Sequence, residues 1–203
     1  MIYTNLPEDV PKFRDYYSHN FEADILFPTR FTIDRIDTIE PTQLKILYID
    51  IEVDSINTVP KPSEAQEQVI AISVYNNLSD IYTSFIYRQD LMPGINSGIF
   101  HDRYHEMKYF NNERAMLKEF ARFVSDEEPD VITGWNVVLF DLMYLINRMK
   151  ALGVDYAQMS PMNWVYTTKE DDVVIKGVAV VDLLKAYRAF SENLEESYTL
   201  DFI

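Results

Sequence analysis

The chain has 203 residues and a formal net charge of −15, with 18 lysines and arginines against 33 aspartates and glutamates. Hydrophobic residues make up 47% of the chain and aromatic residues 14%, so a packed core is expected and intrinsic disorder is not. The absence of cysteine excludes disulfide frameworks and zinc sites built on thiolates. So negative a charge also argues against unaided tight binding of nucleic acid, because phosphate contacts come largely from clustered lysine and arginine.

No apolar run approaches the roughly 20 residues of a membrane span, and the N-terminus lacks the basic and apolar segments of a signal peptide. We therefore expect a soluble, cytoplasmic protein without membrane contact. The length suits one domain, or one domain and part of another. The acidic, proline-containing stretch 37–42 precedes the first strong strand signal, so we predict a short lead-in at 1–43 and the main domain at 44–203.

Three stretches rich in β-branched and aromatic residues follow one another after this boundary. They are Ile46–Val53, Val69–Tyr75 and Ile81–Tyr87. Their short connections predict an antiparallel meander. Farther on, His101 and His105 have the spacing of one helix face, where a solvated surface is favoured over a zinc pair because no third ligand is evident.

The second half of the main domain changes to helical periodicity. We predict a helix capped by Asn112 and ended by Pro129, a short strand at Val131–Thr133, and a second helix that ends at Gly153. Two further strands and a helix are predicted at the end, over Trp164–Thr168, Val173–Val181 and Leu183–Phe190. This succession predicts an α/β fold, with a mixed sheet flanked by helices.

The strongest strand contains two acids, Asp50 and Glu52. Side chains two apart in a strand lie on the same face, so both carboxylates point one way while Ile51 points the other. Two adjacent carboxylates are a natural place for a divalent cation. The alternative is a solvated polar face, which antiparallel sheets often keep.

A third acid, Asp141, is predicted in the first turn of the second helix. An acid in the first turn of a helix interacts favourably with the helix dipole, so the alternative is that Asp141 only stabilises the helix. The same strand-to-helix connection also carries Asn136 and Phe140, which offer an amide and an aromatic ring to a ligand. Connections of this kind in α/β proteins are frequent ligand sites.

These residues carry a resemblance to a known family. Asp50-Ile-Glu52 is similar to the first exonuclease motif, D-x-E, of family B DNA polymerases. Asn136-Val-Val-Leu-Phe140-Asp141 is similar to the second, N-x-x-x-F-D. The chain thus resembles the 3′→5′ proofreading exonuclease domain of these enzymes, in particular the archaeal-type replicative ones. Further similar segments are Asp9–Arg14, Phe21–Ile25, Arg30–Asp34, Val181–Leu183 and Ser197–Asp201.

The resemblance implies a ribonuclease-H-like mixed sheet of the DEDD exonuclease type, with residues 1–43 as the end of the polymerase N-terminal domain. The family's third motif, Y-x-x-x-D, has no match, because Tyr198-Thr-Leu-Asp201 has a spacing of three and aligns with an earlier segment. We therefore expect a fragment of a longer polymerase that ends before this motif and before the last helices of the domain. Its own nuclease activity is expected to be weak or undetectable.

The resemblance also implies the chemistry. Two divalent ions, Mg²⁺ or Mn²⁺, would be held by Asp50, Glu52 and Asp141, and Asn136 and Phe140 would hold the terminal nucleotides of a single-stranded or frayed DNA 3′ end. The implied partners are this DNA end, the palm, fingers and thumb domains, and a sliding clamp reached through the full-length protein, in a nucleoid-associated location. Two alternatives stay open: a non-catalytic scaffold of polymerase ancestry, and an unrelated nuclease on a ribonuclease-H-like sheet.

Overall fold

The computed structural model describes residues 6, 8–21, 23, 25–55, 60–90, 99–101, 104–169, 172–191, 195–200 and 202. The chain divides into two units, Met1–Thr42 and Gln43–Ile203. The first unit has two short helices, α1 (Asp9–Arg14) and α2 (Phe27–Arg35), neither of which buries a residue. The second unit contains the sheet and the core.

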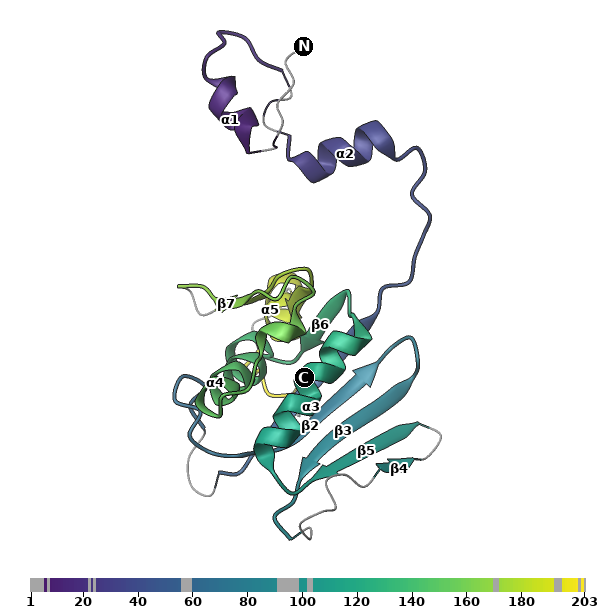
Figure 1. Ribbon diagram of the computed structural model, residues 1–203, viewed down its shortest axis with the longest axis vertical. Helices are drawn as coiled ribbons and strands as arrows, with labels where there is room; N and C mark the ends of the chain where they lie inside the picture. Colours follow the sequence, from purple (N-terminus) through teal and green to yellow (C-terminus); the bar gives the residue numbers. More distant parts are fainter. Residues whose placement is uncertain are drawn as a thin grey trace. The chain divides into compact units, whose positions relative to one another are not determined.

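A mixed sheet dominates the second unit, and its strands run in the order β4-β5-β3-β2-β1-β6-β9. Figure 1 shows β4, β5, β3 and β2 side by side in this sheet. Strands β1, β2 and β3 form the antiparallel meander expected from the sequence. Strands β6 and β9 extend the sheet in parallel beyond β1. The predicted α/β class with a mixed sheet is thus confirmed. The strands are β1 (Ile46–Val53), β2 (Val69–Asn76), β3 (Ile81–Tyr87), β4 (Ile99–His101), β5 (His105–Phe110), β6 (Val131–Gly134) and β9 (Ala179–Asp182).

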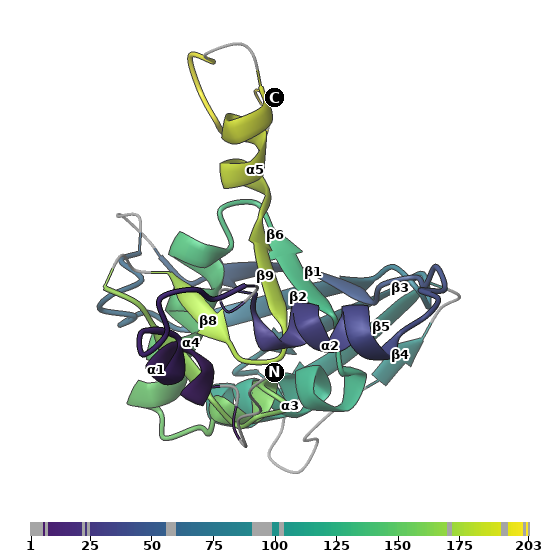
Figure 2. The same cartoon turned by 90° about the horizontal axis from the view of Figure 1, so that it is seen from above.

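One face of the sheet is covered by α3 (Glu113–Glu127), next to α4 (Met143–Ala151). The Asn112 side chain caps α3 as predicted, because its Oδ1 accepts the Ala115 N–H at 2.9 Å. Helix α5 (Leu183–Phe190) follows β9 and lies on the opposite side of the sheet from α3 (Figure 2). Between the sheet and α3 and α4 lies the core, which includes Leu47, Ile49, Ile72, Phe85, Met116, Leu117, Phe120, Ile132, Leu145 and Ile146.

Two local predictions were wrong. His105 begins strand β5, which pairs in parallel with β3, and so does not lie on a helix; the side chain of His101 is outside the described residues. The single strand predicted at Val173–Val181 is interrupted, because Gly177 adopts a left-handed φ of +88° that ends an extended run. The first piece, β8 (Val173–Ile175), pairs with β7 (Val165–Thr167) in a separate two-stranded sheet, and the second is β9.

A short 3₁₀ helix, η2 (Ala157–Met159), lies between α4 and β7. Within the described ranges, no helix has both the length and the apolar character needed to cross a bilayer.

Candidate active site

The polar residues singled out by the sequence gather where the parallel strands β1, β6 and β9 end. Tyr48 of β1 lies opposite Thr133 of β6, and Gly134 at the end of β6 lies opposite Asp182 at the end of β9. Ligands of α/β proteins commonly bind beyond the carboxyl ends of such strands. This edge of the sheet is therefore the candidate site.

Asp50 and Glu52 lie on the exposed face of β1, while Ile49 and Ile51 point into the core. The predicted alternation is thus observed. Pairing with β2 shifts register immediately after Glu52, an irregularity of the kind that often re-aims side chains beside active sites. Partial burial of the Asp50 carboxyl raises its pKa above the ordinary value.

The connection after β6 is not the ordinary helix start that the sequence suggested. Asn136 takes a left-handed φ of +59°, which asparagine tolerates better than most residues. A π-helix, η1 (Val138–Leu142), follows, and the Leu142 N–H donates to the Val137 carbonyl at 2.9 Å. Single π turns are rare and occur frequently at functional sites. Here the wider turn carries both Phe140 and Asp141.

Asp141 is the buried member of the site, with 3% of its surface exposed. Its Oδ1 accepts the backbone N–H of Ile51 at 3.0 Å, so its carboxyl touches β1 between Asp50 and Glu52. Burial, and next the negative charge of Asp50, raise the pKa of Asp141 to about 7, although the Ile51 N–H opposes the shift. The structure thus brings the acids of the two motifs together.

Phe140 and Asn136 flank this carboxyl on the same connection. Phe140 is half-buried, packs against the core, and has its ring centroid 6.0 Å from that of Tyr144. Asn136 is half-exposed, and its carbonyl accepts the Phe140 N–H at 3.0 Å. Asn136 and Phe140, which the sequence predicted as ligand-binding residues, therefore also help to form the turn.

Asp182 also belongs to the site, although the sequence suggested no role for it there. Its Oδ1 accepts the N–H groups of Leu184 and Lys185 and so caps α5, while its Oδ2 accepts the Val138 N–H of the π-helix at 3.1 Å. An aspartate before an apolar helical run is a recognisable cap. The bond to Val138 spans 44 residues and leaves no local pattern in the sequence.

The donor set at this edge consists of carboxylates, the oxygen ligands preferred by Mg²⁺ and Mn²⁺. The like charges of Asp50 and Asp141 interact, as the raised pKa of Asp141 indicates, and a cation would offset their repulsion. Among the residues that the structure describes, no group of three or more histidines, aspartates or glutamates is arranged to hold a metal ion. The residues present therefore fit part of a divalent-cation site.

The close approach of β6 to β1 depends on Gly134. A Cβ at this position would lie 2.4 Å from the Ile49 carbonyl oxygen, a main-chain atom that cannot move aside alone. We expect Gly134→Ala to lower the free energy of unfolding by about 2–3 kcal/mol, as overpacking does. Urea denaturation would measure the loss.

The matched control is Gly153→Ala, where nothing lies within 4 Å of the added Cβ but the φ of +62° disfavours alanine. We expect it to lose about 1 kcal/mol from backbone strain alone. Equal losses in the two variants would show that the contact with Ile49 does not constrain Gly134.

Comparison with known proteins shows the family of the chain. A family model described as the exonuclease domain of DNA polymerase family B matches residues 5–203. The chain is 29% identical over 195 residues to the DNA-directed DNA polymerase of Escherichia phage RB69, covering 80% of this chain and 21% of that protein. It is 29% identical over 210 residues to the DNA polymerase delta catalytic subunit of Candida albicans, covering 94% and 18%.

A third relative is the DNA polymerase of Pyrococcus glycovorans, which is 31% identical over 163 residues that cover 75% of this chain and 19% of that protein. The chain spans about a fifth of the length of each of these relatives. Since the family model covers nearly all of it, the chain belongs to the exonuclease-domain family of the family B DNA polymerases.

Proposed function

We propose that this chain supplies the 3′→5′ proofreading exonuclease site of a family B DNA polymerase, which hydrolyses the terminal phosphodiester of single-stranded or frayed DNA. The observation that carries the proposal is the bond from the Ile51 N–H to Asp141, which joins residues 90 apart in the sequence and places Asp141 beside Asp50 and Glu52. Family membership supports the same reaction.

Asp50, Glu52 and Asp141 would hold the divalent ions, Mg²⁺ or Mn²⁺. When bound, such ions supply the positive charge that activates a water molecule and stabilises the leaving 3′ oxygen. The exposed face of β1 leaves Asp50 and Glu52 accessible to the substrate phosphate. Asp141 is buried and accepts a hydrogen bond from the main chain of β1, so it would hold a fixed position relative to Asp50 and Glu52.

The DNA end would be held by the connection after β6. The exposed part of the Phe140 ring would stack on a terminal base, and the Asn136 amide would hydrogen-bond the nucleotide beside it. Because the chain is strongly acidic, phosphate contacts would come from the palm, fingers and thumb of the polymerase. We therefore propose that the 203-residue chain hydrolyses DNA slowly, since among the described residues no three carboxylates are arranged around a single cation position.

A single-turnover assay tests this function. An excess of the chain is incubated with a 3′-labelled single-stranded oligonucleotide and Mn²⁺, and the products are separated by size. We expect slow release of nucleoside monophosphates from the 3′ end, with complete loss when EDTA removes the metal. Cleavage from the 5′ end or at internal positions would contradict the proposal, and so would an absence of product at any protein excess, the outcome expected of a scaffold.

A further inference from the structure

A buried ion pair joins α3 to α4 away from the candidate carboxylates. The Arg148 Nε and Nη2 donate to the two carboxylate oxygens of Glu113 at 2.8 and 2.7 Å, and the two side chains are only 12% and 6% exposed. Two parallel hydrogen bonds fix both distance and orientation. A buried ion pair is weak evidence for stability, so its geometry is the more informative property.

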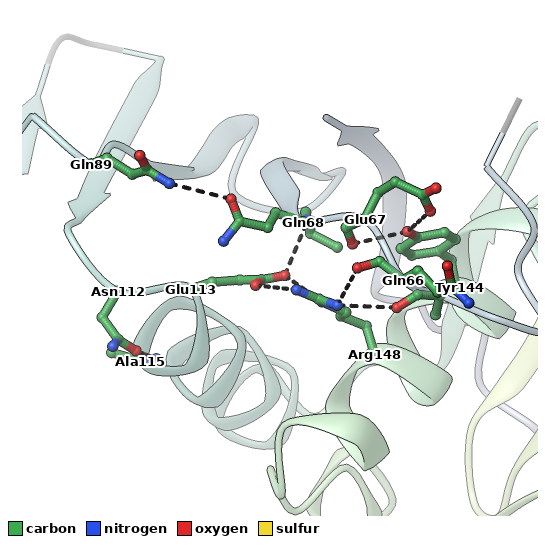
Figure 3. A network of polar contacts seen from close by, with 11 residues as sticks. Gln66, Glu67, Gln68, Gln89, Asn112, Glu113, Ala115, Tyr144 and Arg148 are labelled. Carbon is green, nitrogen blue, oxygen red and sulfur yellow. Dashed lines mark hydrogen bonds and ion pairs between the residues drawn. The ribbon is translucent and has the colours of Figure 1, made fainter. Parts of the chain in front are cut away.

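The same two side chains also hold the segment that leads into β2 (Figure 3). Arg148 Nη1 donates to the carbonyls of Ala65 and Gln66 at 3.1 and 2.7 Å. Glu113 Oε1 accepts the Val69 N–H at 2.9 Å, where β2 begins. We call Glu113 and Arg148 the clamp.

Helix α4 makes two more bonds to this segment. The Tyr144 hydroxyl donates to the Glu67 carbonyl at 2.9 Å, and Asn147 Nδ2 donates to the Pro62 carbonyl at 2.9 Å. Side chains on one face of α4 thus form several hydrogen bonds to main-chain carbonyls of the β1–β2 connection. The Tyr144 hydroxyl also lies 3.2 Å from Glu67 Oε2, but most partners are main-chain carbonyls, so α4 mainly fixes the path of this connection.

The clamp therefore connects the two halves of the candidate site. On one side, the held segment enters β2, where Val69 pairs with Val53 and Ala71 pairs with Glu52. On the other side, α4 continues directly from the π-helix that carries Asp141. A shift of α4 against the β1–β2 connection would change the distance between Asp141 and Glu52.

We propose that Glu113 and Arg148 are positioning residues, which keep Asp141 in register with the end of β1 that carries the acidic pair. The proposal rests on the proposed function of that site. It predicts that loosening the clamp weakens the bond from the Ile51 N–H to Asp141 and disturbs cation binding. A purely stabilising ion pair would lower stability without either local effect.

Two glutamates of the same helix provide a matched test. Glu113 begins α3 next to the start of β2, where it accepts the Val69 N–H. Glu127 ends the same helix near the start of β1, where its Oε2 accepts Asn76 Nδ2 at 2.8 Å and lies 3.4 Å from Lys45 Nζ. Glu113→Gln and Glu127→Gln thus remove the same charge from opposite ends of one helix. Arg148→Lys keeps its charge but loses the forked geometry, and it serves if Glu113→Gln does not fold.

Two readouts are taken on the 203-residue chain: hydrogen exchange of the Ile51 amide relative to the Val74 amide, and Mn²⁺ affinity by electron paramagnetic resonance. We expect Glu113→Gln and Arg148→Lys to speed relative Ile51 exchange by about tenfold and to weaken Mn²⁺ binding by about fivefold, as local loosening does. Glu127→Gln should change neither.

If the clamp variants match Glu127→Gln in both readouts, the positioning role is overturned. If relative Ile51 exchange rises in the clamp variants but the unmodified chain binds no Mn²⁺, the clamp does position Asp141 and it is the proposed metal-dependent function that fails.

Discussion

Replacing Asp50 by alanine is expected to slow Mn²⁺-dependent release of 3′-terminal nucleotides by about a thousandfold or more, a loss of about 4 kcal/mol of transition-state stabilisation. Asp50 lies on the exposed face of β1 and interacts electrostatically with Asp141. Its removal would take one carboxylate ligand from the proposed cation site. The single-turnover assay with labelled oligonucleotide measures the rate.

The control for this variant is Asp126→Ala, an equal loss of charge at an exposed position on α3, where Asp126 contacts Arg122 at 3.4 Å. It should leave the rate unchanged. In a longer polymerase that contains this chain, Asp50→Ala should abolish trimming of a mismatched 3′ end and spare nucleotide addition. Persistent trimming in that variant would remove Asp50 from the proposed catalytic set.

The parts of the fold that follow from local sequence pattern were predictable. Alternation in Ile46–Val53 predicts the strand and places Asp50 and Glu52 on one face, and the Asn112 cap predicts where α3 begins. Strand β5 was missed because it runs parallel to β3, a pairing that depends on distant residues and on no alternation of its own.

The sequence predicted which acids come together at the candidate site, apart from Asp182, but not how they are arranged. The motifs identify Asp50, Glu52 and Asp141, yet nothing local indicates that Asp141 accepts a hydrogen bond from the main chain of β1. The π-helix leaves no local pattern either, and its Val138 N–H donates to Asp182, which is 44 residues away in the sequence. Long-range hydrogen bonds of this kind fix the relative positions of the motifs, and no local sequence pattern predicts them.

Replacing Asp141 by asparagine is expected to stabilise the metal-free chain at pH 8, and hardly at all at pH 4. The pKa of Asp141 is about 7 in the folded chain, against an ordinary value of 3.8. Between these two values the folded chain holds a proton that the unfolded chain has lost, so stability falls as pH rises from about 4 to about 7. Above pH 7 the full loss of folding stability is reached. Each unit of pKa difference corresponds to about 1.4 kcal/mol, so the total loss is about 4 kcal/mol.

Asparagine suits this test because its side-chain oxygen can still accept the Ile51 N–H, while the buried charge disappears. Urea denaturation in EDTA at several pH values between 4 and 8 measures the difference between Asp141→Asn and the unmodified chain. Asp126→Asn, the same substitution at an exposed carboxylate, should show no such growth with pH. A constant difference for Asp141→Asn across the range would mean that Asp141 is already ionised at pH 4. The burial of Asp141 and the charge of Asp50 would then not raise its pKa as the structure indicates.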